Sequence, residues 1–232
     1  ANMQSREAAA NRFSGHWNMR GEKPYHRYAF AGGVDHVMEN AAAYSSSGTI
    51  SPGGELDLMR QLHDMFMAER PPADGHRQNV LGKYHTHVGI GFALVGGEFR
   101  YYEEYIDRYL EFVQCPAVLR AGEKGTITVR PGRPGYHVYA FMVYYEPFPQ
   151  AMSPSQINRM GSYPDYTGKT ALSVWPHTFK ADPSGAVTIP VSFSQRGLYY
   201  LQVYLDTKPY PGSGSMTTEG KIQASGVVIR VE

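Results

Sequence analysis

Hydrophobic and polar positions in the first part of the chain follow a helical spacing. Residues 3–13 hold strong helix formers, including three consecutive Ala, and predict a helix that Gly15 ends. A second short helix is expected from about residue 25 to residue 33, where two Gly stand together. Residues 45–54 are rich in Ser, Gly and Pro and predict a loop.

The clearest helical pattern runs from about Glu55 to Glu69. Its apolar stripe consists of Leu56, Met59, Leu62 and Phe66. Arg70-Pro71-Pro72 ends this helix, because proline cannot continue the backbone hydrogen bonds of a helix.

The pattern then changes to strands. Residues 84–95 alternate as a strand does, and Gly96-Gly97 predicts a turn before a second extended run over 99–105. The second run is ambiguous, since its tyrosines also fit a helical stripe. Gly89 and Gly91 lie within the first strand with no helix after them, so we interpret them as sites of close packing rather than as a dinucleotide-binding loop.

The last part of the chain reads as short strands separated by turns. The predicted strands are 125–130, 137–145, 169–175, 186–193, 198–205 and 226–231. Six or seven short strands in about 115 residues are typical of an immunoglobulin-like β-sandwich. Residues 150–168 are expected to form a long loop between strands.

Composition limits the classes of protein to consider. A chain of 232 residues fits one large or two ordinary domains, and we place the boundary at Gln114-Cys115-Pro116, giving domains 1–113 and 114–232. A net charge of +1 argues against a dedicated nucleic-acid-binding protein. No stretch has the roughly 20 apolar residues of a transmembrane helix. The single cysteine, Cys115, excludes an internal disulfide framework and is interpreted as a buried or bystander thiol.

Histidines are concentrated at one end of the chain, where the candidate chemistry also lies. Seven of the nine fall within the first 87 residues. Glu69 continues the apolar stripe of its helix, where a carboxylate is costly unless it is paired, and His76 follows seven residues later. Glu39 stands in a small, apolar context, and His16 follows a predicted helix end. Two His and two Glu fit either a divalent-metal site or two acid–base pairs.

A resemblance to a known family connects these four residues. The run His76–Ala93 (HRQNVLGKYHTHVGIGFA) resembles bacterial members of the CAP superfamily, also called SCP-like, which includes cysteine-rich secretory proteins, antigen 5 and pathogenesis-related proteins. His16, Arg27–Gly32, Glu39-Asn40-Ala41-Ala42 and Phe66-x-x-Glu69 resemble the family's upstream elements. The order and approximate separations hold over residues 8–105.

The resemblance implies a fold and a site. Residues 1–113 are expected to form an α-β-α sandwich with an open cleft, so that the whole chain would be α+β, with an immunoglobulin-like sandwich after it. The family's cleft tetrad would be His16, Glu39, Glu69 and His76. Its two His would bind Zn²⁺ or another divalent metal, and its two Glu are the candidate acid–base residues. The family usually has about one more helix and a short strand before its first His. Only 15 residues precede His16 here, so that element is missing, is compressed or lies before the given sequence, and without it one side of the cleft would be more open.

Two functions are compatible with this tetrad. In the first, an exported bacterial protein binds a divalent metal, a small ligand or a component of the cell envelope, and the second domain is an adhesive or spacing module. In the second, the tetrad is an extracellular metal-assisted peptidase or esterase. By the resemblance, the expected location is extracellular or periplasmic, after removal of a signal peptide.

Overall fold

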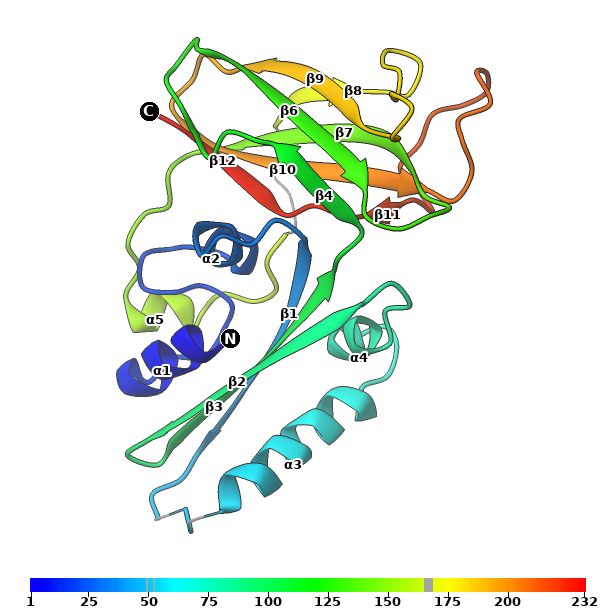
Figure 1. Cartoon of the computed structure of the whole chain (residues 1–232). Coiled ribbons are helices and arrows are strands. Elements are labelled where there is room, and N and C mark those ends of the chain that lie inside the picture. The colour runs from blue at the N-terminus through cyan, green and yellow to red at the C-terminus, as the bar shows by residue number, and fades with distance from the viewer. Residues whose placement is uncertain (49, 52, 165–168) are drawn as a thin grey trace. The chain divides into compact units, whose positions relative to one another are not determined.

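A computed structural model of the chain describes residues 1–48, 50–51, 53–164 and 169–232. Helices and strands are mixed in the first half of the sequence and strands predominate in the second half, so the fold is mixed α and β with several sheets (Figure 1). No helix within these residues is long and apolar enough to cross a lipid bilayer.

The described chain divides into two compact units, each built from three segments. The first unit contains Ala1–Pro24, Val37–Ile106 and Pro149–Tyr163, and the second contains Tyr25–His36, Asp107–Phe148 and Pro164–Glu232. Our predicted boundary was a single point after residue 113. Residues 25–36 and 149–163 belong to a different unit from their neighbours in the sequence, an arrangement that no single boundary can describe.

The first unit is built around a three-stranded sheet with the order β1-β3-β2. Its elements are α1 (Asn2–Asn11), β1 (His36–Ser45), α3 (Gly54–Ala68), α4 (Gly75–Val80), β2 (His87–Val95), β3 (Glu98–Asp107) and α5 (Pro154–Ile157). The helix predicted over 3–13 and the strand predicted over 84–95 are confirmed, and the ambiguous run over 99–105 is a strand. Strand β1 was not predicted, because its three consecutive Ala and its Glu-Asn pair carry little strand propensity.

Strand β3 is covered by helices on both faces, because successive side chains of a strand point in opposite directions. On one face, Phe99 and Tyr101 pack with α3. On the other face, Tyr102 packs with α1 and donates a hydrogen bond from its hydroxyl to the backbone oxygen of Gly15 at 2.9 Å. Gly91 of β2 permits the close approach of α1, since a Cβ there would overlap the backbone of Ala1 and Asn2. This confirms the packing interpretation for Gly91.

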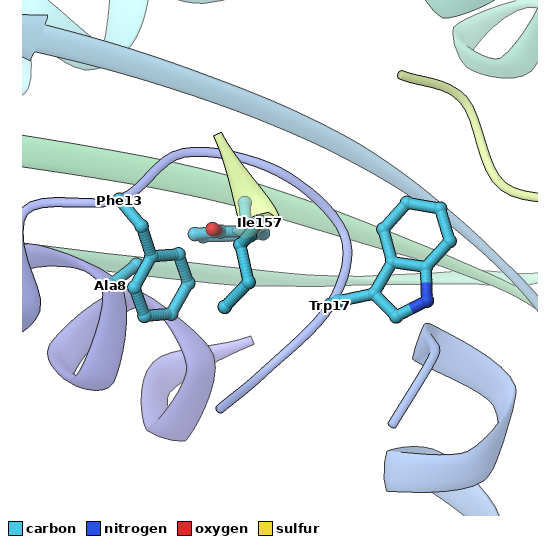
Figure 2. Close-up of a cluster of buried hydrophobic side chains, with 5 residues drawn as sticks. Ala8, Phe13, Trp17 and Ile157 are labelled. Atoms are coloured by element: carbon cyan, nitrogen blue, oxygen red, sulfur yellow. The ribbon is translucent and has the colours of Figure 1, made fainter. Parts of the chain in front are cut away.

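A compact apolar cluster holds α1 to segments that are distant in the sequence. Its buried members are Ala8, Phe13, Trp17, Tyr102 and Ile157. Figure 2 shows Ala8, Phe13 and Ile157 close together, with Trp17 farther along the loop that follows α1. Ile157 comes from α5, so this cluster explains why residues 149–163 belong to the first unit.

The amphipathic helix α3 is confirmed, but its buried stripe differs from the prediction. The buried residues are Leu58, Leu62 and Phe66, spaced four apart, and they pack on Phe99 and Tyr101 of β3. Leu56 was predicted to be buried and instead is 52% exposed. Leu58 lies four positions before Leu62 and shares its face of the helix, whereas Leu56 lies six positions before Leu62 and is turned away from that face.

The second unit contains α2 (Pro24–Phe30) and two sheets. One sheet has the order β5-β12-β10-β7-β8, with β11 paired to β10, and the other has the order β4-β6-β9. The strands are β4 (Leu110–Gln114), β5 (Val118–Leu119), β6 (Lys124–Pro131), β7 (His137–Glu146), β8 (Thr170–Val174), β9 (Val187–Ser192), β10 (Gly197–Asp206), β11 (Ile222–Gln223) and β12 (Val227–Val231). All six strands predicted for this part of the chain are present.

Four elements beyond residue 107 were missed, namely strand β4, the two-residue strands β5 and β11, and helix α5. Strand β4 pairs with β6 across the position at which we placed the domain boundary. Helix α5 lies within the predicted 150–168 loop, of which residues 165–168 fall outside the described part of the chain. Its start carries a capping box, in which the Ser153 side chain accepts from the backbone of Gln156 and the Gln156 side chain accepts from the backbone of Ser153.

Candidate functional site

The structure joins the four residues of the predicted tetrad in two pairs, of which His16 and Glu39 form the more buried. Nδ1 of His16 lies 2.9 Å from Oε1 of Glu39, whose side chain is fully buried. The edge of the His16 ring also contacts the ring of Tyr163 at 4.8 Å between centroids. The Tyr163 hydroxyl accepts a hydrogen bond from the backbone N–H of Glu39 at 3.3 Å, so Tyr163 contacts both members of the pair.

The loop that carries His16 is held on both sides of that residue. Gln4 of α1 donates to the backbone oxygen of Trp17 at 2.9 Å, and Tyr102 donates to that of Gly15. Arg100 of β3 donates from Nε to the backbone oxygen of Phe13. These buried bonds fix the backbone around His16, and Glu39 then fixes the orientation of its ring.

Glu69 and His76 form the second pair, at the turn between α3 and α4. Nδ1 of His76 lies 2.5 Å from Oε1 of Glu69, while Oε2 accepts from the backbone N–H groups of His76 at 2.9 Å and Arg77 at 3.3 Å. The His76 ring stacks on Phe66 with 4.7 Å between centroids. Partial burial alone would raise the pKa of Glu69, but the hydrogen bonds from the His76 ring and the two N–H groups outweigh it and leave this pKa below its ordinary value.

The two pairs differ in their access to solvent. The side chains of His76 and Glu69 are 36% and 24% exposed, against 12% and zero for His16 and Glu39. Within the described chain, Nε2 of His76 has no hydrogen-bond partner. The structure therefore pairs each predicted His with one predicted Glu, and the second pair leaves an imidazole nitrogen available to a ligand.

Asn40 links strand β1 to the helix that carries His76. Its side-chain amide donates to the backbone oxygen of His76 at 3.1 Å, and its oxygen accepts from the Asn79 side chain at 2.9 Å. Because neighbouring side chains on a strand point to opposite faces, Glu39 and Asn40 connect β1 to the loop after α1 and to α4, respectively.

The four tetrad residues supply only part of the coordination that a metal ion needs. In the described ranges, no three His, Cys, Asp or Glu side chains converge on a point where they could hold a metal ion. The predicted metal site uses only the two histidines as ligands. One observation agrees with it, namely that each histidine has a carboxylate at its Nδ1. A histidine that gives Nδ1–H to a carboxylate presents Nε2 as a ligand atom, as metal-binding histidines commonly do.

Cys115 contributes no nucleophile to this region. Burial raises the pKa of its thiol to about 12. The thiolate, which is the reactive form, is therefore scarce near neutral pH.

A third pairing of His and Glu was missed in the sequence. His63 of α3 lies with Nδ1 2.6 Å from Oε1 of Glu103 on β3. Tyr101 and Tyr105 flank Glu103 at two-residue spacing and donate their hydroxyls to it at 2.7 and 2.6 Å. This Tyr-x-Glu-x-Tyr alternation was the available signal, but the ambiguity between helix and strand over 99–105 concealed it.

Comparisons with known proteins add no family assignment. No protein-family model matches the chain, and no curated protein matches it. Among solved structures, a chitin binding domain from Burkholderia pseudomallei is similar with a TM-score of 0.29 and 8% identity, over 51% of this chain and 57% of that one. The matched region thus spans little more than half the length of that domain, and a similarity of this size carries no argument about fold or function.

Proposed function

We propose that the first unit is a CAP-like binding domain whose His16–Glu39 and His76–Glu69 pairs bind a divalent metal, Zn²⁺ in the first instance, together with a small or envelope-derived ligand. The observation that carries the proposal is the shared geometry of the pairs. In each, a carboxylate lies within hydrogen-bond distance of Nδ1 of the imidazole. This contact orients the ring and favours the tautomer with its proton on Nδ1, which leaves Nε2 as the ligand atom.

The helices on both faces of the β1-β3-β2 sheet support the CAP-like part of the proposal. The two sheets of the second unit support an immunoglobulin-like sandwich, which we propose acts as an adhesive or spacing module. By the same resemblance, we propose that the protein is exported. Fractionation of the source cells, with the protein detected by antibody, tests the location independently of the binding site.

Zinc titration of the whole chain tests the metal. We expect His16→Ala and His76→Ala each to weaken Zn²⁺ binding by at least about tenfold, because loss of one of two imidazole ligands removes a principal metal–ligand bond. His87→Ala is the matched control, since His87 is exposed in the same unit and contacts Thr86 rather than a carboxylate. Equal zinc affinity in the wild type and both variants, or a loss confined to His87→Ala, would overturn the proposal.

Hydrolysis is the second candidate, and the exposure of His76 favours it. An imidazole oriented by Glu69 with Nε2 open to water can act as a general base, a role worth typically 10²–10⁴-fold in rate. Peptidase and esterase substrates tested with the wild type and Glu69→Gln discriminate this candidate from binding without turnover. Hydrolysis requires activity that falls by about that factor in the variant, whereas binding predicts equal, background rates for both proteins.

A further inference from the structure

A pocket of about 470 Å³ lies between α3 and strands β2 and β3, within the first unit. It is lined by Leu56, Met59, Arg60, His63, Asp64, Val88, Ile90, Tyr101, Glu103 and Tyr105. None of these residues belongs to the two pairs discussed above. The volume is in the range of sites for small organic molecules.

The walls of this pocket are largely apolar and open to solvent. Leu56 of α3 and Val88 and Ile90 of β2 are 52%, 51% and 48% exposed. Single exposed apolar residues are common on proteins, but these three line one hollow. Covering them with an apolar molecule removes apolar surface from water, which favours binding.

The imidazole of His63 forms the polar end of the pocket, and the carboxylate of Glu103 fixes its orientation. Each oxygen of Glu103 is within hydrogen-bond distance of two groups, Oε1 of Tyr101 and His63, and Oε2 of Tyr105 and Asn40. Burial, with the nearby Glu103 carboxylate, raises the pKa of both tyrosines, so their hydroxyls stay protonated and donate.

The same arrangement fixes the role of each nitrogen of His63. The Glu103 carboxylate has no hydrogen to donate, so it accepts from His63 as it does from its other partners. Nδ1 of His63 therefore carries the proton. In the neutral ring, Nε2 is then a hydrogen-bond acceptor. In the described part of the chain, this nitrogen has no partner, and the His63 side chain is 40% exposed.

The charges around the pocket limit the ligand further. Asp64 and Glu103 both line it, so an anionic ligand would meet two acidic side chains. The one basic residue of the lining, Arg60, lies 3.4 Å from Asp57 in an exposed ion pair. We propose that this pocket binds a small, neutral, mostly apolar molecule with one hydroxyl group, such as an alkylphenol, and that the hydroxyl donates a hydrogen bond to Nε2 of His63.

The matched probes 4-propylphenol and 4-propylanisole test this assignment, because the ether lacks only the hydrogen-bond donor. Titration of the whole chain, followed by the chemical shifts of its backbone amides, is expected to show the phenol binding about five- to tenfold more tightly. In His63→Phe the difference between the probes should disappear while the ether still binds. Continued binding of the ether shows at the same time that the variant is folded.

A second pair of variants locates the binding site. Leu56→Glu places a charge in the apolar wall and should weaken both probes by about tenfold or more. Met65→Glu is the matched control, because Met65 is on the same helix, is 64% exposed and lies outside the pocket lining.

Several outcomes would overturn the proposal. They are equal binding of phenol and ether to the wild type, no binding of either, equal loss in Leu56→Glu and Met65→Glu, and tighter binding of 4-propylbenzoate than of the phenol. Zinc titration of His63→Phe separates this site from the proposed function, since the expected zinc affinity is that of the wild type.

Discussion

Strands β3 and β10 are both interior strands of their own sheets, but they bury different kinds of side chain. Each has ten residues, pairs with a strand on both sides and is buried along most of its length. Strand β10 buries mainly hydrocarbon and aromatic rings, such as Leu198, Leu201 and Val203. Strand β3 buries Arg100, Glu103 and Glu104 at 8% exposure or less.

The difference shows where the first unit departs from what stability alone requires. Burial of a charge is costly unless partners compensate it, and a well-packed apolar core is often at least as stable. Strand β10 shows that this chain builds such a strand without buried charges. The buried carboxylate of Glu103 instead needs hydrogen-bond partners from other elements, a requirement that the apolar residues of β10 do not have.

Removal of Glu103 should produce the largest effect. Glu103→Ala leaves Tyr101, Tyr105 and His63 without their acceptor, and we expect a loss of about 4 kcal/mol in the free energy of unfolding of the first unit. Trp17 lies in the first unit and Trp175 in the second, so denaturant unfolding of each unit can be followed by fluorescence after the other Trp is replaced by Phe.

A double variant separates the loss of bonds from the loss of volume. Glu103→Ala with Tyr105→Phe should cost at least about 1 kcal/mol less than the two single changes added together, because one donor no longer lacks an acceptor. Strictly additive costs would show that Glu103 acts through packing, as Leu201 does in β10.

Substitutions that conserve side-chain volume should have the next largest effect, and their stability costs should differ between β3 and β10. Glu103→Gln keeps the volume but removes the charge, and whichever oxygen it replaces, its amide N–H₂ faces one tyrosine hydroxyl and one nitrogen donor. We expect it to cost roughly 2–3 kcal/mol. Leu201→Met in β10 should cost only about 1 kcal/mol, since volume is nearly conserved in an apolar site. Equal costs in the two strands would contradict the comparison.

Loss of one donor to Glu103 should have a smaller effect. Tyr105→Phe removes a 2.6 Å bond to the carboxylate and is expected to cost roughly 1.5 kcal/mol. The same denaturation experiment measures it, and Tyr204→Phe in β10, whose hydroxyl donates to the neutral amide of Gln202, should cost less.

We expect the smallest effect at Glu69. This residue lies outside both strands, and its carboxylate is in contact with water. Its pKa is lower in the folded chain than in the unfolded chain, mainly through bonds from His76 and Arg77 that overcome the effect of burial. Its contribution to stability is therefore present above the unfolded value of about 4.3 and is lost as the pH falls through the folded pKa. Stability measured from pH 6 to pH 3 should decline less steeply in Glu69→Gln than in the wild type. Identical pH profiles would show that Glu69 does not contribute in this way.

The sequence by itself determined the local elements and singled out the four residues that the structure joins in two His–Glu pairs. Strand alternation and turn residues located all six expected strands of the second unit, and helical periodicity located α1 and α3. The resemblance to the CAP family grouped His16, Glu39, Glu69 and His76 as one tetrad, and the structure brings His16 within hydrogen-bond distance of Glu39 and His76 within hydrogen-bond distance of Glu69. Local preference suffices for such features because turn chemistry and side-chain periodicity act over a few residues.

The tertiary structure alone decided which segments share an interior and which carboxylates become buried. Ile157 joins the cluster of α1, and Glu103 receives hydrogen bonds from α3 and β1 as well as from its own strand. Both depend on contacts between residues far apart in the sequence, which a local pattern does not encode. Position 103 looks like an ordinary alternating strand residue until the sheet is covered on both faces, and only then does its carboxylate require partners.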